Sequence, residues 1–228
     1  MDTRRDIAQA IAAAARTINQ TRSLDETLQA ITDAARDSVP GFDHVGISTL
    51  QKGGEVDTKA ATDDLVLQLD TLQYGLAEGP CVDTLREADV VVAPRIRHDQ
   101  RWPRYVPAAV EMGLRSQLAV RLYLDDQGTL GGLNLYSTTS DDIAPEAEAT
   151  AELFAAHAAI ALGNARQRDT LNEALQSRKV IGQAIGIVME RYEMSEDRAF
   201  AFLVRASSHA NIKVRDIAQE LVDQRNGQ

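Results

Sequence analysis

Apolar positions recur with two different periods along the chain: every second residue, as in strands, and every three to four residues, as in helices. The strand period occurs in the front part of the chain. Between residues 43 and 137, short runs alternate apolar and polar residues, which is typical of half-buried strands. In the clearest run, residues 116–124, Leu118, Val120, Leu122 and Leu124 fall on one face, and Arg121 and Tyr123 on the other. Glycine-containing turns at 52–54 and 125–128 separate neighbouring runs, so we expect them to pair. Strands are predicted at 43–50, 55–62, 89–93, 116–124 and 129–137.

Helices are predicted on both sides of these strands. Residues 7–18 carry Ile7, Ile11, Ala14 and Ile18 on one stripe, which favours an amphipathic helix over a signal peptide. A second helix begins after Ser23, a suitable N-cap, and ends before Pro40-Gly41. Further helices are expected at about 63–74, at 103–112 and from Pro145 onward, with loops at 75–87 and 94–103. A sheet with flanking helices makes the front part an α+β domain.

The last part of the chain follows only the helical period. Its three apolar stripes predict a small all-α domain of three helices around one core. Ser195 is placed to cap the second helix, and Asn211 to end it in the left-handed conformation. The stripes comprise Ile181, Ile185 and Val188, then Phe200, Leu203 and Val204, then Val214, Ile217, Ala218, Leu221 and Val222.

A long helical stretch joins the two parts. It carries an imperfect seam at heptad-like spacing. One interpretation is a helical stalk through which two copies form a homodimer, and the other is a long helix packed against its own sheet. The seam consists of Phe154, Ala158, Ala161, Ala165, Leu171, Leu175 and Arg178.

Composition narrows the class of protein. Of 228 residues, 44% are hydrophobic and 25% charged, as in a globular chain, and no apolar run approaches the ~18 residues of a membrane span. A single cysteine excludes an internal disulfide and makes the cytoplasm the expected compartment. The net charge of −10 argues against unspecific binding to nucleic acid. Residues 164–228, however, hold 10 Lys and Arg against 9 Asp and Glu, so the acidity belongs to the front part.

The polar positions of the C-terminal domain suit RNA. Cations at the start of its third helix oppose the helix dipole, and a local rule broken without a packing reason indicates function. Polar side chains and small residues near Ala206 match the way proteins bind the bases of RNA loops. The candidate contacts are Arg178, Lys179, Gln183, Arg205, Ser208, His209, Asn211, Lys213 and Arg215.

The same region closely resembles the ANTAR domain, an RNA-binding module of transcription antiterminators. The match rests on Ser177-Arg178, the run Ile181–Met189, Ala199-Phe200, Leu203, Ser207, Asn211, Lys213, Arg215-Asp216 and Ala218. The resemblance implies dimers that bind paired RNA stem-loops and prevent a terminator hairpin from forming. The chain departs from the family at Ile185, where the family often has a lysine.

The front part resembles the GAF sensor domains found before ANTAR domains, through EGPCVDTLRE and RWPRYVPAAVEMGLRSQLAV. The resemblance implies a GAF-like antiparallel sheet flanked by helices. The expected organisation is an N-terminal helix at 1–22, a GAF-like sensor at 23–163, a helical linker at 164–176 and an ANTAR domain at 177–224.

The sensor has candidate ligand contacts but no evident catalytic site. A pocket between the sheet and the loops near residues 76–82 and 96–105 would place Glu78, Cys81 and Trp102 around a small-molecule ligand. Cys81 has no basic neighbour in sequence, so a buried small residue is the favoured interpretation. The four histidines lack metal-ligand spacing, and no nucleotide-binding or nucleophile motif follows a strand. Neither a metal nor another cofactor is expected.

The sequence therefore favours an RNA-binding transcription antitermination regulator under the control of a sensor domain. A dimerisation or protein-docking module without RNA binding is the principal alternative, motivated by Ile185 and the near-neutral C-terminal charge. A DNA-binding helix-turn-helix is a further alternative. A methionine sulfoxide reductase is disfavoured, because that chemistry needs further cysteines.

Overall fold

The computed structural model describes residues 23–51, 53–86 and 88–226, which fall into two compact units. Unit 1 ends at Ala165 and unit 2 begins at Arg166, within one continuous helix, α6 (Ala147–Tyr192). The helix predicted at 7–18 lies outside the described residues.

Unit 1 is built on a five-stranded antiparallel sheet with the strand order β2-β1-β5-β4-β3. The two predicted hairpins are present, and β1 pairs with β5 so that the first and last strands lie side by side at the centre. The predicted strands are therefore confirmed, each to within one or two residues. The strands are β1 (His44–Leu50), β2 (Val56–Ala61), β3 (Val90–Ala93), β4 (Ser116–Leu124) and β5 (Gly128–Ser137).

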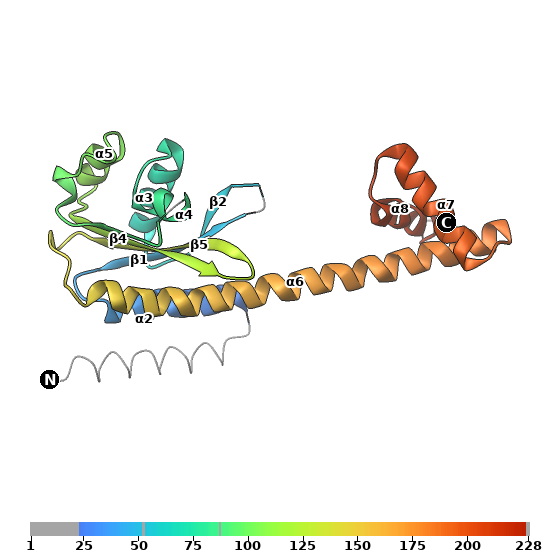
Figure 1. Cartoon of the computed structure of the whole chain (residues 1–228), viewed down its shortest axis with the longest axis horizontal. Helices are drawn as coiled ribbons and strands as arrows, with labels where there is room; N and C mark the ends of the chain where they lie inside the picture. Colours follow the sequence, from blue (N-terminus) through green and yellow to red (C-terminus); the bar gives the residue numbers. More distant parts are fainter. Residues whose placement is uncertain (1–22, 52, 87, 227–228) are drawn as a thin grey trace. The chain divides into compact units, whose positions relative to one another are not determined.

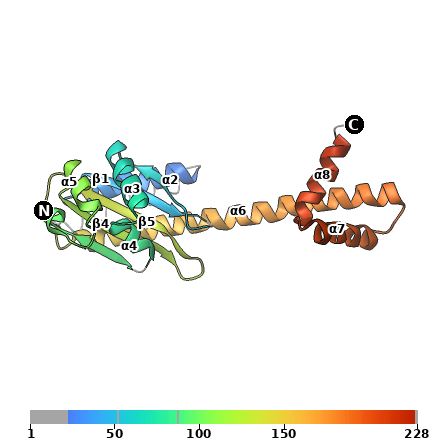
Figure 2. The same ribbon diagram turned by 90° about the horizontal axis from the view of Figure 1, so that it is seen from above.

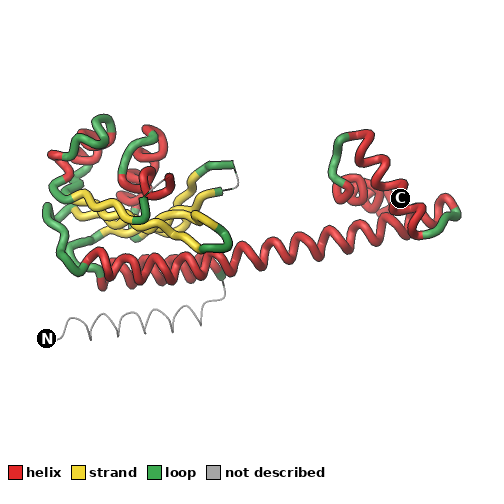
Figure 3. The backbone as a smooth tube through the Cα atoms, viewed as in Figure 1, coloured by secondary structure: helices red, strands yellow, loops and turns green. Residues whose placement is uncertain are grey.

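Helices cover both faces of the sheet, which gives unit 1 three layers (Figures 1 and 3). One layer consists of α2 (Leu24–Ser38) and the first part of α6; the other consists of α3 (Asp64–Leu76), α4 (Pro80–Arg86) and α5 (Tyr105–Glu111). Helix α2 begins at a capping box, in which Ser23 Oγ accepts from the Glu26 N–H at 3.2 Å and Glu26 Oε2 accepts from the Ser23 N–H at 3.3 Å.

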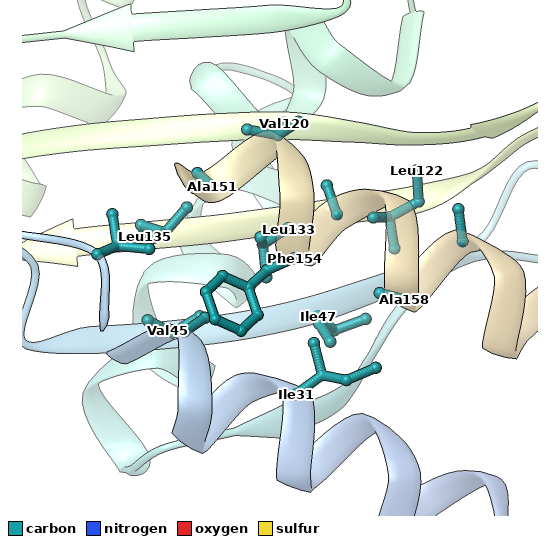
Figure 4. Close-up of a cluster of buried hydrophobic side chains, with 14 of the residues drawn as sticks. Ile31, Val45, Ile47, Val120, Leu122, Leu133, Leu135, Ala151, Phe154 and Ala158 are labelled. Carbon is teal, nitrogen blue, oxygen red and sulfur yellow. The ribbon is translucent and has the colours of Figure 1, made fainter. Parts of the chain in front are cut away.

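Each face of the sheet has its own apolar core. Phe154 of α6 is 1% exposed and points between α2 and the sheet, where Ile31, Val45 and Leu133 surround it (Figure 4). The second core lies under α3 and α5 and includes Trp102. Because both faces are covered, residues on either side of a strand can be buried: Ala119, on the opposite face of β4 to Leu118 and Val120, is also fully buried.

Two predictions for unit 1 were wrong in detail. Residues 75–87, expected to be a loop, contain helix α4, which begins at Pro80 directly after Gly79 at φ +128°. Seven residues are too few to show a helical period, but proline is suited to a first helical turn. Residues 94–103 include a short 3-10 helix, η1 (Ile96–His98).

Phe154 and Ala158, the first positions of the heptad-like seam, are buried against the sheet of the same chain. For this part of α6, packing on its own sheet was therefore the right interpretation. Leu171 and Leu175, further along the seam, are 61% and 56% exposed.

Unit 2 consists of the rest of α6, α7 (Glu196–Ala210) and α8 (Val214–Asn226), as Figure 2 shows from above. The predicted three-helix core is present, with buried residues from each helix. Its fully or nearly fully buried members are Ala184, Val188, Ala199, Leu203, Ala218 and Val222.

The predicted apolar stripe of α7 needs a correction. Ala199 and Leu203 are fully buried, whereas Phe200 and Val204 are 47% and 37% exposed. Successive helical residues are about 100° apart, so Phe200 and Val204 form the adjacent row. The inner face of α7 therefore combines a small residue, Ala199, with a large one, Leu203, and the small side chain lets the helices approach each other closely.

Candidate nucleic-acid interface and sensor interior

The turn between α7 and α8 is held by hydrogen bonds and is followed directly by a positively charged residue, Lys213. Asn211 adopts the left-handed conformation (φ 54°, ψ 39°), and its N–H donates to the Ser207 carbonyl. The Ser207 hydroxyl donates to the Ile212 carbonyl across the same turn, and Lys213 follows directly. Asn211, predicted as an RNA contact, therefore also terminates α7.

All nine residues predicted to bind RNA are exposed, and they come from three places in unit 2. Ser208 donates a hydrogen bond to the Val204 carbonyl of its own helix at 3.0 Å. An ion pair in unit 2 joins Arg225 to Glu190 at 2.8 Å and involves none of the nine. Arg178, Lys179 and Gln183 lie on α6, Arg205, Ser208 and His209 on α7, and Asn211, Lys213 and Arg215 in the turn and the start of α8.

Charge is unevenly distributed along this unit. The stretch from Arg198 to Arg215, here called the cationic segment, contains four arginines and lysines and no carboxylate. Acidic residues precede it at the start of α7 and follow it on α8, so its positive charge is not neutralised within the segment. The flanking carboxylates are Glu190, Glu193, Glu196 and Asp197 before it and Asp216, Glu220 and Asp223 after it.

Arg198 is a candidate contact that the sequence analysis missed. It is exposed and lies seven residues before Arg205, so the two side chains project from the same side of α7. His209, four residues after Arg205, continues the row. The spacing of these three residues was the available signal.

Two exposed glycines of α6 leave the helix backbone uncovered by side chains beside two of the candidate contacts. Gly182 and Gly186 are exposed, and a Cβ atom at either position would have no neighbour within 4 Å. Lys179 and Gln183 lie one turn apart next to these glycines. Ile185, where the ANTAR family often has a lysine, packs partly buried against the core of unit 2.

In unit 1, the space between the sheet and α3 is filled by a buried hydrogen-bonded network. Asp70, fully buried, accepts from Tyr136 OH and, at 3.1 Å, from Asn134 Nδ2. Asn134 Nδ2 also donates to Ser48 Oγ at 3.2 Å, and Ser48 Oγ lies 3.5 Å from Cys81 Sγ. In all, seven structural elements contribute to this network: β1, β2, β4, β5, α3, α4 and α5. Its other members are Thr58, Gln73, Tyr74, Tyr105 and Gln117.

The three candidate ligand contacts of the sensor lie in different surroundings. Cys81 is fully buried in this network, and burial raises the pKa of its thiol to about 12. Trp102 is 2% exposed and donates from Nε1 to Asp83 Oδ2 at 2.9 Å. Glu78 accepts from Arg104 Nε at 2.6 Å and from the Arg104 N–H at 2.9 Å, and these bonds hold its pKa below the usual range.

Two surface hollows of unit 1 lie beside α6 and η1 instead. One, of about 410 Å³, is lined by Arg95, Asp142 and Glu148 among others, and an adjoining one of about 530 Å³ includes His98 and Asp99. Neither is lined by Glu78, Cys81 or Trp102. Within the described residues, no cluster of histidine, cysteine and carboxylate groups could hold a metal ion. No helix in the described part of the chain is both long and apolar enough to cross a membrane.

The structure consists of an α+β unit followed by a helical unit, and family models identify a domain in each. The GAF domain model matches residues 21–163, more than half of the chain, and the ANTAR domain model matches residues 169–222. The chain therefore belongs to the GAF-domain family and carries an ANTAR domain after its GAF domain. Both are regulatory domains.

Solved structures share the fold of the sensor. The GAF domain of a phosphoenolpyruvate-protein phosphotransferase from Coxiella burnetii aligns with a TM-score of 0.60 at 16% identity, covering 75% of this chain and 99% of that one. The corresponding Acinetobacter domain aligns at 0.56 and 14%, covering 72% and 97%. The chromophore-binding domain of a bacteriophytochrome from R. palustris aligns at 0.55 and 13%, covering 72% of this chain and 63% of that one. A comparison with curated protein sequences finds no significant match.

Proposed function

We propose that this chain is a transcription antitermination regulator whose ANTAR domain binds paired stem-loops in nascent RNA under the control of its GAF domain. The observation that carries the proposal is the cationic segment, in which Arg198, Arg205, Lys213 and Arg215 are exposed without a carboxylate between them. Such a segment attracts phosphates, and the polar residues of the turn between α7 and α8 are suited to base edges.

The charge distribution favours RNA binding over a pure docking role. Unit 2 is close to neutral in sum, yet its acidic residues flank the cationic segment and leave it uniformly positive. A nucleic acid can therefore contact this segment without meeting the net negative charge of the whole chain. The exposed glycines of α6 add a surface that a backbone can approach closely.

The test is binding of the full chain to RNA with two adjacent hairpins, measured by fluorescence anisotropy at several salt concentrations. A single-hairpin RNA, a loop-scrambled RNA and duplex DNA serve as controls. We expect tight binding to the paired hairpins only, with an affinity that falls as salt rises, because phosphate contacts release counterions.

Matched variants then locate the interface. The quadruple variant R198Q/R205Q/K213Q/R215Q should reduce the slope of log K against log [salt] by about 3, since each lost phosphate contact contributes about 0.7–0.9. The variant R166Q/R168Q/R191Q/R225Q removes the same charge from unit 2 outside the segment and should keep most of the slope. Equal losses in the two variants, or binding that ignores salt, would favour the docking module instead.

We also propose that the chain forms a homodimer through α6. Leu171 and Leu175 are the support: both are large, apolar and more than half exposed, and apart from Ala174 the residues next to them on the helix are polar. Exposed leucines four residues apart on one helix are expected to be covered by another apolar surface. A second copy of the same helix presents such a surface by symmetry.

A further inference from the structure

The buried carboxyl group of Asp70 has an unusual set of partners. It lies on α3, is 0% exposed, and none of the ion pairs formed by the described residues includes it. Its contacts are hydroxyl and amide groups, namely Tyr136 OH, Asn134 Nδ2 at 3.1 Å and Thr58 Oγ1 at 2.7 Å. A carboxylate in this position is hydrogen-bonded but has no compensating cation.

Asn134, the amide partner of Asp70, carries an unused acceptor. Its Nδ2 donates both to Asp70 Oδ1 and to Ser48 Oγ, while its Oδ1 is buried and has no hydrogen-bond partner among the described residues. A buried acceptor without a donor is costly and rare in folded proteins. The amide would use this oxygen if Asp70 became a donor.

We propose that Asp70 is a proton-binding site of the sensor, in which its carboxyl group and the amide of Asn134 switch together between two hydrogen-bonded arrangements. In the ionised arrangement, the amide N–H groups face Asp70 and Ser48, as the structure shows. When Asp70 takes up a proton from solvent, its O–H becomes a donor. The amide then turns over, so that Oδ1 accepts from Asp70 and from the Ser48 hydroxyl, while Nδ2 takes the place that Oδ1 occupies in the ionised arrangement.

The change at Asp70 and Asn134 also affects α4, because Ser48 contacts both Asn134 and Cys81 of α4. Ser48 Oγ now lies 3.4 Å from the Gly132 carbonyl and 3.5 Å from Cys81 Sγ. Redirecting the Ser48 hydroxyl to Asn134 changes its contacts with β5 and with α4. Proton uptake at Asp70 could therefore act as the signal of the sensor without a small-molecule ligand. This proposal does not depend on whether the ANTAR domain binds RNA.

The other titratable groups around Asp70 stay neutral near neutral pH. Burial raises the pKa of Tyr74, Tyr105 and Tyr136 above the usual range and that of Cys81 to about 12. Burial also raises the pKa of Asp70 itself, to about 6, although hydrogen bonds from Tyr136, Thr58, Tyr74 and Asn134 lower it. A proton taken up here near pH 6 therefore belongs to Asp70. The other charged or titratable groups on the elements around Asp70 are not buried. They are His44 on β1, which pairs with Asp63 at 2.6 Å, Asp57 and Lys59 on β2, Asp63 and Asp64 at the start of α3, Asp83 and Arg86 on α4, Glu111 on α5 and Arg121 on β4.

The first test is direct titration of the full chain by NMR between pH 4.5 and 8. The side-chain carbonyl carbon of Asp70 should titrate with a midpoint near 6, and the side-chain N–H₂ signals of Asn134 should move with the same midpoint. A midpoint near 4, or Asn134 signals that do not follow, would overturn the proposal. This measurement requires no variant.

The second test is the pH dependence of unfolding, followed by the fluorescence of Trp102, the chain's one tryptophan, which is buried in unit 1. A pKa raised in the folded state adds stability below the unfolded pKa near 4, and this stability is lost as pH rises through 6. Between pH 4 and 7 the folding constant of the native chain should therefore fall about 100-fold relative to D70N. D64N, which removes an exposed carboxylate from the same helix, should follow the native chain. Equal pH profiles for the native chain and D70N would contradict the proposal.

Discussion

Gly182 and Gly186 stand on the exposed side of a helix where nothing in unit 2 requires a glycine. Glycine in a helix interior is less favourable than alanine by about 1 kcal/mol, because it has more conformational freedom to lose. A Cβ atom at either position has open space, so no packing contact explains the residue. The proposed RNA surface does, if the nucleic acid approaches α6 closely there.

The double variant G182A/G186A should therefore separate folding from binding. We expect the free energy of unfolding of unit 2 to rise by about 1–2 kcal/mol, as measured by circular dichroism during urea denaturation. Affinity for the paired hairpins should fall at the same time. The same substitution at Gly131, where a Cβ would collide with the backbone carbonyl of Ser48, should destabilise unit 1 and is a contrasting control. Unchanged RNA affinity in G182A/G186A would remove α6 from the proposed interface.

At the scale of elements, regular patterns were predictable and local packing was not. Strands β1, β4 and β5 and helices α2 and α6 follow from alternation, caps and helical spacing, because these signals extend over many residues. Helix α4 was missed because it is short. The inner face of α7 was misassigned because Ala199, not Phe200, faces the core, and residue size does not encode how closely two helices approach.

Of the candidate sites, the exposed residues of unit 2 could be predicted from the sequence, whereas Arg198 and the buried network of unit 1 were not. The residues predicted from charge and polarity in unit 2 are all exposed, as their types suggested. Arg198 escaped notice because its relation to Arg205 depends on the orientation of α7. In the sensor, no sequence pattern predicted the network around Asp70, since its members come from seven elements far apart along the chain.

The end of α7 offers a way to separate a residue's role in folding from its role in binding. Asn211 terminates the helix at φ 54°, a conformation that asparagine and glycine adopt readily and β-branched residues avoid. N211G should preserve the free energy of unfolding, whereas N211V should lower it by about 1–2 kcal/mol.

RNA affinity then distinguishes the two roles of Asn211. If its amide contacts a base, N211G should bind the paired hairpins less tightly although it folds normally. If N211G binds as the native chain does, Asn211 serves the turn alone. Urea denaturation and anisotropy on the same two variants give both answers.

At the scale of the whole molecule, the proposed dimer decides how many ANTAR domains one molecule presents to paired hairpins. Substituting both exposed leucines, in L171E/L175E, should shift the chain from dimer to monomer in sedimentation equilibrium, because charged residues in a desolvated seam are strongly unfavourable. The variant N172E/Q176E, which adds the same two negative charges at exposed polar positions of the same helix, is a matched control that should leave the dimer intact. A native chain that sediments as a monomer at micromolar concentration would contradict the proposal.

A dimer would also strengthen RNA binding without any new contact. Two linked ANTAR domains that engage two linked hairpins convert the second binding event into an intramolecular one. The monomeric variant should therefore lose its preference for paired over single hairpins, even though each domain retains its cationic segment.

The burial of Cys81 has a practical consequence for all of these measurements. The chain's one thiol is fully enclosed, and with a pKa of about 12 it is almost entirely protonated at pH 8. Alkylating reagents and spin labels react with thiolates. A cysteine introduced at an exposed position outside the proposed interfaces, such as Gln219 on α8, would therefore be modified selectively in the otherwise native sequence. Interspin distances between two labelled copies could then be recorded with and without RNA.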